Sequence, residues 1–189
     1  GRKANTANIG LEHTDIATNE RGAIVVNDTC ESSVPGVYAV GDVNGGPQFT
    51  YISLDDFRIV FGALTGNSQY TLKDRKNIPY TTFLTPPLSR VGLTEEDAIN
   101  QGYTVKTKEM LVATMPRAHV NDYLKGAFKI VVDADNDLIL GATLYSQGAE
   151  ELINLIKMAM DNNIPYTYFK NQIFTHPTMA ENLNDLCNF

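Results

Sequence analysis

The pattern of hydrophobic and polar positions changes about a third of the way along the chain. In the first part, short apolar runs alternate with turn residues, and we expect buried strands at Gly22–Val26 and Val37–Val40. No helical period lies between them. Two strands without a connecting helix do not complete a doubly wound unit, so this part of the chain is expected to be the edge of something larger.

A helix is predicted to follow, with Thr50 as its N-cap and Gly66-Asn67 at its end. Its apolar residues recur at helical spacing: Leu54, Phe57, Val60 and Phe61. The polar stretch 67–77 that comes next has the composition of a linker. We therefore predict a first domain over residues 1–66 and a second over residues 78–189.

Beyond the polar stretch, the pattern alternates between strand and helix signals. Strands are expected at residues 79–84, 90–93, 103–114, 126–132 and 138–145. The turn Asp133–Asp137 joins the last two strands as a hairpin. This mixture predicts an α+β fold, in which an antiparallel sheet is backed by helices.

Helices are expected in the same region. The run Thr94–Asp97 resembles a capping box that opens a short helix ending at Gly102. The strongest helical pattern spans residues 148–162. Its apolar face is expected to comprise Leu152, Leu155, Ile156 and Ala159. Its solvated face is expected to comprise Glu150, Glu151 and Asp161. A short helix over residues 179–186 closes the chain.

The composition is that of a globular protein, with 43% hydrophobic residues. A formal net charge of −7 and the lack of a Lys/Arg cluster argue against nucleic acid as a partner. No apolar run approaches the ~18 residues that a membrane helix needs, and the N-terminus lacks a secretory h-region. Cys30 and Cys187 have neither metal nor CxxC spacing, so we expect no metal site and predict a reducing, cytoplasmic compartment.

Gly41-Asp42 directly follows the second expected strand. An aspartate here places a carboxylate at the carboxyl edge of a sheet, where open α/β folds bind ligands, although a loop-capping aspartate gives the same local pattern. Next, Gln48-Phe49-Thr50-Tyr51 leads into the predicted helix, whose N-terminus favours an anion. An ordinary helix start is the alternative.

His176 precedes a proline, which disfavours a helical conformation for the histidine and predicts an extended elbow. The next helix is expected to begin near Thr178, so that Glu181 folds back towards the imidazole. A carboxylate partner orients a histidine and raises its basicity, which suits general acid–base catalysis near neutral pH. A structural or merely exposed histidine is the alternative. His13 and His119 are both expected at the surface.

Two of these segments carry a family resemblance. Val34–Asp42 resembles the second FAD fingerprint of the flavin-dependent pyridine nucleotide–disulfide oxidoreductases. Phe174–Glu181 resembles the His-Pro-Thr…Glu signature of the same family. The resemblance implies that the chain comprises the C-terminal segment of an FAD-binding domain followed by a dimerisation domain.

The resemblance also assigns roles to the candidate residues. It implies that Gly41 and Asp42 bind the cofactor, the aspartate through the ribityl chain of the flavin. It implies that the helix after Gln48–Tyr51 points at the pyrimidine side of the isoalloxazine, where the reduced flavin becomes negative. His176, with Glu181 as its partner, is implied to be the acid/base for a thiol proton, acting across a dimer on the flavin and redox cysteines of the other subunit.

The resemblance extends over essentially the whole chain. Gly1-Arg2 with Asn5-Thr6 resembles the entry into the last FAD-domain segment, and Pro86–Gly92 resembles the start of the interface domain. Phe49–Asp56 and Asn182–Leu186 are most similar to the bacterial branch that includes the reactive-chlorine-resistance flavoprotein, a hypothiocyanous acid reductase.

The chain lacks a GxGxxG motif and a CxxxxC pair. The implied FAD, NAD(P)H and redox cysteines therefore require upstream domains, and we expect this chain alone to bind little FAD and to be inactive. We expect a homodimer through residues 78–189. A stand-alone dimerisation module without catalysis is the alternative. The substrate stays open among a small disulfide, mercuric ion and a hypohalous or hypothiocyanous oxidant, although the single C-terminal Cys187 argues against mercuric ion.

Overall fold

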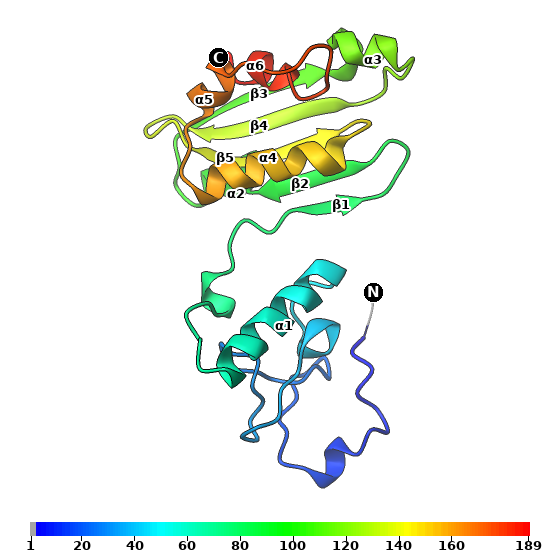
Figure 1. Ribbon diagram of the computed structural model, residues 1–189, viewed down its shortest axis with the longest axis vertical. Coiled ribbons are helices and arrows are strands. Elements are labelled where there is room, and N and C mark those ends of the chain that lie inside the picture. Colours follow the sequence, from blue (N-terminus) through cyan, green and yellow to red (C-terminus); the bar gives the residue numbers. More distant parts are fainter. Residues whose placement is uncertain (1–2) are drawn as a thin grey trace. The chain divides into compact units, whose positions relative to one another are not determined.

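The computed structural model describes residues 3–189; Gly1 and Arg2, which carry part of the family resemblance, lie outside the described residues. The chain forms two compact units, one ending at Lys76 and the other spanning Asn77–Phe189. Figure 1 shows the helices and strands of each unit. Within residues 3–189, no helix is both long enough and apolar enough to cross a lipid bilayer.

Within residues 77–189, the second unit is built on a five-stranded antiparallel sheet in the order β1-β2-β5-β4-β3. The strands are β1 (Tyr80–Thr82), β2 (Leu88–Gly92), β3 (Val105–Leu111), β4 (Ala127–Asp133) and β5 (Ile139–Tyr145). Asp133 closes the β4–β5 hairpin, because its carboxylate accepts hydrogen bonds from the backbone N–H of Asp135 and the side-chain amide of Asn136. The predicted α+β class is confirmed.

Five α-helices accompany the sheet in this fully described unit: α2 (Glu95–Asn100), α3 (Pro116–Val120), α4 (Ala149–Asp161), α5 (Tyr166–Asn171) and α6 (Asn182–Leu186). α4 packs on β2 and β5, and α6 packs on β3 and β4 (Figure 1). Their apolar residues meet the sheet in one core, where Phe128, Ile156 and Leu183 are fully buried. The sequence pattern does not predict α3 and α5, because helices of five or six residues are too short to show a period.

α4 is enclosed over more of its circumference than the sequence pattern indicates. Its buried residues are Ala149, Leu152, Ile153, Ile156, Ala159 and Met160. Leu155 of the predicted apolar face is only half-buried. The expected solvated face is wrong for two acids: Glu150 is half-buried with one carboxylate oxygen enclosed, and Asp161 accepts hydrogen bonds from Lys157 and Asn77. The helix therefore buries polar as well as apolar groups.

Among its described residues, the first unit has one α-helix, α1 (Thr50–Leu64), and three 3-10 turns: Leu11–His13, Gly41–Asn44 and Leu72–Asp74. The strands expected over residues 22–26 and 37–40 are wrong. These runs form only isolated bridges: Thr18 with Ile24, Val26 with Ser32, and Glu31 with Tyr38. The backbone takes positive φ angles at three points between residues 22 and 36, so the chain turns too often for a regular ladder.

α1 buries a different face from the predicted one. Thr50 is its first helical residue, and Phe49 takes the N-cap position. The buried residues of the helix are Ile52, Asp56 and Ile59. Phe57 and Phe61, which belong to the predicted apolar face, are 54% and 57% exposed. Because an aspartate lies in the middle of the buried face, the hydrophobic pattern points to the wrong side of the helix.

The stretch 67–77, expected to be a linker, carries ordered structure. A capping box closes the 3-10 turn Leu72–Asp74. Arg75 forms ion pairs with Asp55 and Asp56 of α1. The greater part of the stretch therefore packs as part of the first unit.

Candidate functional site

The segment that resembles a flavin fingerprint ends in the 3-10 turn Gly41–Asn44. Gly41 has a φ angle of +73°, and a Cβ atom at this position would lie 2.6 Å from Oγ of Ser53 on α1. Both the backbone conformation and the close approach to the helix therefore require glycine. The next residue, Asp42, is exposed. The turn thus packs tightly on α1 and presents a carboxylate at its surface.

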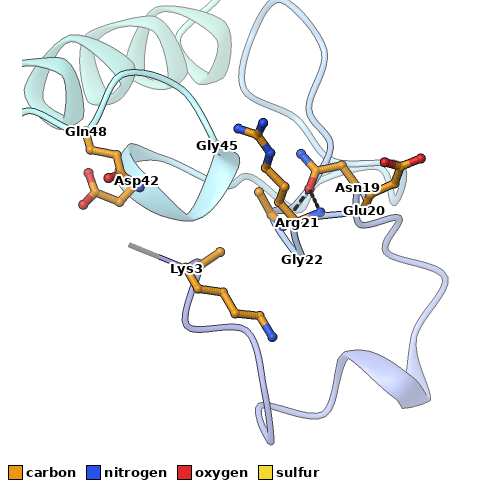
Figure 2. A pocket seen from close by; sticks show the side chains of 10 residues that line it. Lys3, Asn19, Glu20, Arg21, Gly22, Asp42, Gly45 and Gln48 are labelled. Atoms are coloured by element: carbon orange, nitrogen blue, oxygen red, sulfur yellow. Dashed lines mark hydrogen bonds between the residues drawn. The ribbon is translucent and has the colours of Figure 1, made fainter. Parts of the chain in front are cut away.

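An open hollow of about 860 Å³ lies beside this turn. Its polar lining comprises Lys3, Asn19, Glu20, Arg21, Asp42 and Gln48. Figure 2 shows Asp42 and Gln48 together on one side of the hollow, with Asn19, Glu20 and Arg21 on another. The hollow therefore brings two cationic side chains and two carboxylates to one place.

Gly41 is buried within the turn, and the other predicted cofactor-binding residues divide into two groups. Asp42 and Gln48 line the hollow. The run Phe49–Tyr51 is exposed but is not among the residues that line it. The ring of Tyr51 instead lies under the guanidinium of Arg58, 5.4 Å from its centre. The structure thus brings together only part of the predicted set.

Sequence reasoning missed the wall of the hollow that faces Asp42. The pattern indicates only a turn at residues 19–21. In the structure, Oδ1 of Asn19 accepts hydrogen bonds from the backbone N–H groups of Arg21 and Ala23, at 2.9 and 3.1 Å. This Asx-type turn fixes the loop that carries Arg21 at the hollow. The available signal was Asn19 next to the charged residues Glu20 and Arg21. These residues are far from Asp42 along the chain, so the sequence does not show that they line the same hollow.

His176 lies in the loop between α5 and α6, where its Nδ1 is 2.8 Å from Oε2 of Glu181. The imidazole is 71% exposed, whereas the side chain of Glu181 is 17% exposed. A largely buried carboxylate therefore holds an exposed ring. Because Nδ1–H donates a hydrogen bond to the carboxylate, Nε2 of the neutral ring is left as a proton acceptor.

Thr178 orients this carboxylate. The backbone N–H of Glu181 donates to Oγ1 of Thr178 at 3.2 Å, and the backbone N–H of Thr178 donates to Oε1 of Glu181 at 3.4 Å. This reciprocal arrangement is that of a capping box. α6 starts at Asn182, later than the predicted Thr178, because these two residues form the turn that precedes the helix.

Two asparagines of α6 fasten the backbone on either side of His176. Nδ2 of Asn184 donates to the carbonyl of Gln172 at 2.9 Å, before the histidine. Nδ2 of Asn182, a buried residue, donates to the carbonyl of Thr178 at 3.2 Å, after it. The sequence does not reveal these two roles, because an asparagine that binds backbone carbonyls has the same local pattern as one that faces solvent.

The two cysteines of the chain are free and buried. Burial raises the pKa of Cys30 to about 11 and the pKa of Cys187 to about 12. Both thiols are therefore protonated at neutral pH and poor nucleophiles. His13 and His119 lie at the surface, as expected. In residues 3–189, no group of His, Cys, Asp and Glu side chains is arranged to hold a metal ion.

The chain resembles known oxidoreductases over almost all its length. It is 48% identical over 186 residues to the probable pyridine nucleotide-disulfide oxidoreductase RclA of Escherichia coli (strain K12), covering 98% of this chain and 42% of that protein. It is 33% identical over 183 residues to mercuric reductase of Staphylococcus aureus, covering 97% and 33%. The chain thus spans less than half the length of these curated relatives.

Solved structures agree with these similarities. The HOCl-induced flavoprotein disulfide reductase RclA from Escherichia coli matches with a TM-score of 0.96 at 48% identity, over 99% of this chain and 43% of that one. LpdA from Mycobacterium tuberculosis matches with a TM-score of 0.88 at 21% identity, over 99% and 40%, which is a likeness of fold alone. The predicted similarity to the reactive-chlorine-resistance branch is confirmed.

Two family models match the chain. The pyridine nucleotide-disulphide oxidoreductase dimerisation domain matches residues 78–187, and a second model, pyridine nucleotide-disulphide oxidoreductase, matches residues 1–56. Full-length members of this family depend on FAD and NAD(P)H. The chain therefore belongs to the pyridine nucleotide-disulphide oxidoreductases and contains their dimerisation domain.

Proposed function

We propose that the full-length protein is a homodimeric, FAD-dependent NAD(P)H oxidoreductase that reduces a disulfide or a small oxidant through a redox cysteine pair. The present chain supplies a wall of the flavin site, the dimer interface and the acid/base pair His176–Glu181. The observation that carries this proposal is the 2.8 Å contact between Nδ1 of His176 and Oε2 of Glu181, on a ring that is 71% exposed.

The hollow beside Asp42 has the groups that FAD requires. Lys3 and Arg21 would balance the negative charges of a pyrophosphate, and the carboxylate of Asp42 would accept hydrogen bonds from ribityl hydroxyls. No side chain caps α1 and no acid lies in its first turn, so its N-terminus favours an anion. FAD bound there supplies the transfer of two electrons from NAD(P)H to a disulfide.

His176 moves a proton between Nε2 and a cysteine sulfur. Nε2 accepts the proton of the thiol, and the resulting thiolate attacks a disulfide sulfur; the imidazolium then returns the proton to the departing thiolate. Glu181 balances the positive charge of the imidazolium and keeps Nδ1 protonated throughout. Thr178 holds the other carboxylate oxygen, so the acceptor of Nδ1–H stays in place while the proton moves.

The thiols of this chain do not serve as the redox pair. Cys30 and Cys187 are buried, protonated at neutral pH and located in different units. The sequence also contains no GxGxxG motif for a dinucleotide-binding fold. We therefore place the redox cysteines and the nucleotide domains upstream, and expect this chain alone to be inactive and to retain little FAD. A reducing cytoplasm suits this chemistry.

The second unit is proposed to form the homodimer. The family model that it matches describes a dimerisation domain. Phe83, Tyr168 and Ile173 of this unit are 78%, 55% and 95% exposed, and aromatic residues such as the first two are enriched in protein interfaces. A stand-alone dimerising module without catalysis is the alternative, but such a module needs neither the turn at Asp42 nor a paired His176.

The test compares the two half-reactions of the full-length protein. In His176→Ala, reoxidation of the reduced enzyme by hypothiocyanite or a small disulfide should slow by ~10²–10⁴-fold, while reduction of the flavin by NAD(P)H keeps its rate. His119→Ala, at another exposed histidine, should change neither rate. Equal slowing of both half-reactions in His176→Ala contradicts the assigned role. If the full-length protein contains no flavin, the alternative function, a dimerisation module without catalysis, is the one that remains.

A further inference from the structure

A buried carboxylate lies beneath the turn that carries Asp42. Asp56 of α1 is 0% exposed. Its Oδ2 accepts hydrogen bonds from the backbone N–H of Gly41 at 2.7 Å and from Nδ2 of Asn44 at 2.9 Å. Its Oδ1 accepts a hydrogen bond from Nη2 of Arg75 at 2.5 Å. One carboxylate oxygen is therefore engaged by the turn and the other by a cation.

The restraint reaches both ends of the turn. Nδ2 of Asn44 also lies 3.3 Å from the carbonyl oxygen of Ala39, and Oδ1 of Asn44 accepts a hydrogen bond from the backbone N–H of Gly46 at 3.0 Å. The backbone before and after Asp42 is thus tied to Asp56, directly or through Asn44. Because glycine has wide conformational freedom, these ties are what hold a glycine-containing turn in one shape.

Arg75 supplies the charge that allows Asp56 to be buried. Its side chain is 10% exposed, and its Nε donates to Oδ2 of Asp55 at 2.7 Å while Nη2 donates to Asp56. A buried carboxylate without a cation carries a large desolvation penalty, and removing one partner of such a pair leaves the other charge uncompensated. Arg75 therefore pairs with the buried carboxylate of Asp56 and fixes its orientation from outside the helix.

We infer that Asp56 and Arg75 are positioning residues for the cofactor site: their ion pair sets the turn Gly41–Asn44, and the turn sets the carboxylate of Asp42. Neither residue is among those that line the hollow, so their effect on a ligand passes through Asp42. The identity of the ligand as FAD rests on the proposed function. The hydrogen bonds that hold the turn are formed within this chain and do not depend on the identity of the ligand.

The first measurement uses the 189-residue chain and needs no cofactor. Amide hydrogen exchange at Gly41, followed by NMR, should quicken by at least about tenfold in Asp56→Asn and in Arg75→Met, because the acceptor of this N–H is replaced or displaced. Arg75→Lys should restore part of the protection. Lys73→Met, which removes the cation of an exposed pair with Asp28, is the matched control and should leave exchange at Gly41 unchanged.

The second measurement follows FAD in the full-length protein. Asp56→Asn and Arg75→Met should each raise the dissociation constant for FAD by at least about tenfold, the effect of one lost charge-assisted hydrogen bond. The gain of flavin fluorescence on release measures the constant. Arg75→Lys should lie between these variants and the parent protein, and Lys73→Met should match the parent.

Unchanged exchange at Gly41 in a folded Asp56→Asn chain overturns the inference. Faster exchange with an unaltered FAD dissociation constant also overturns it, because the turn would then not set the ligand site. If Asp56→Asn does not fold, Asn44→Ala takes its place. This variant removes the Nδ2 donor to Asp56 and keeps the Asp56–Arg75 ion pair. It should show the same faster exchange at Gly41 and the same weaker binding of FAD. A full-length parent protein that binds no FAD contradicts the proposed function, whereas exchange at Gly41 still decides whether Asp56 holds the turn.

Discussion

The side-chain amide of Asn184 donates a hydrogen bond to the carbonyl of Phe169 at 2.6 Å, across 15 residues of chain. The same Nδ2 lies 3.3 Å from the carbonyl oxygen of Lys170 and 2.9 Å from that of Gln172. One amide thus gathers the carbonyls at the end of α5, where the backbone leads into the loop of His176. The position of this loop therefore depends on a residue that follows it in the sequence.

Replacing Asn184 by leucine removes these hydrogen bonds with little change of size. We expect the free energy of unfolding to fall by about 1–3 kcal/mol, because partly buried carbonyls lose their donor, and the ring of His176 to become more mobile. Urea denaturation and NMR relaxation measure the two effects. Asn171→Leu, whose amide donates to the carbonyl of Thr167 at an exposed site, is the control. Equal losses in both variants contradict the special role of Asn184.

Glu181→Gln separates the charge of the carboxylate from its hydrogen bond. Glutamine still accepts from Nδ1–H of His176 but does not balance an imidazolium, so reoxidation by the substrate should slow by at least about tenfold in the full-length protein. Glu181→Leu also removes the acceptor, and 15N shifts of His176 should then show less of the Nδ1–H tautomer. Equal rates in the parent protein and Glu181→Gln would show that the charge is irrelevant.

Gly41→Ala should cost more stability than Gly66→Ala. The two glycines have φ angles of +73° and +76°, so both alanines incur the left-handed penalty of about 1–2 kcal/mol. Only at Gly41 does the new Cβ also lie 2.6 Å from Oγ of Ser53; at Gly66 nothing lies within 4 Å. We expect an extra loss of at least about 1 kcal/mol, partly recovered by adding Ser53→Ala. Identical denaturation curves for the two variants contradict the close approach.

Alkaline pH should destabilise the chain through its buried thiols. Burial raises the pKa of Cys30 and Cys187 in the folded state from 9.0 to about 11 and about 12. The unfolded chain therefore loses these protons first as the pH rises. The resulting stabilisation is complete below about pH 9 and is lost as the pH approaches the folded-state values. Urea denaturation across this window should show a falling free energy of unfolding, with a shallower fall in Cys187→Ala. If the free energy of unfolding falls equally steeply with pH in the parent protein and in Cys187→Ala, Cys187 does not contribute to the alkaline destabilisation.

Ile173→Asp should convert the proposed dimer into monomers. This isoleucine is 95% exposed and lies in the same loop as His176, and a carboxylate without a partner is costly in an apolar interface. Sedimentation velocity at micromolar concentration measures the state. Ile9→Asp, at a residue of the first unit that is 57% exposed, should stay dimeric. A monomeric parent chain contradicts the proposed dimer, and a dimeric Ile173→Asp excludes this loop from the interface.

Local signals account for much of the second unit. The capping box at Thr94 and the hairpin turn at Asp133 are each recognised within a few neighbouring residues, and the structure confirms both. The first unit differs because its order depends on contacts between distant residues. Asp56 lies on the buried face of α1, where it forms an ion pair with Arg75, and no local pattern predicts that a helix face containing a carboxylate is the buried one.

The candidate site was likewise predictable where its signals are local and not where they depend on contacts between distant residues. Short motifs mark Asp42 and His176, because the turn Gly41–Asn44 and the segment Thr175–Glu181 are each continuous in sequence. Arg21 at the hollow and Asn184 behind the loop were not predictable, since each acts on a segment that is remote along the chain. Their roles follow from tertiary contacts, which are visible in the structure but not in a single sequence.

The hydrogen bonds that join His176, Thr178 and Glu181 all lie within the segment Thr175–Glu181. Oγ1 of Thr178 donates to the carbonyl of Thr175 at 2.8 Å, the N–H of Glu181 donates back to Thr178, and the carboxylate of Glu181 meets His176. Each copy of the chain therefore carries both residues of the proposed proton-transfer pair. In a mixed dimer of parent and His176→Ala chains, one of the two pairs stays intact. Because the resemblance implies that His176 acts on the flavin and cysteines of the other subunit, the loss should fall on the site of the parent copy, and the dimer should keep about half of its activity.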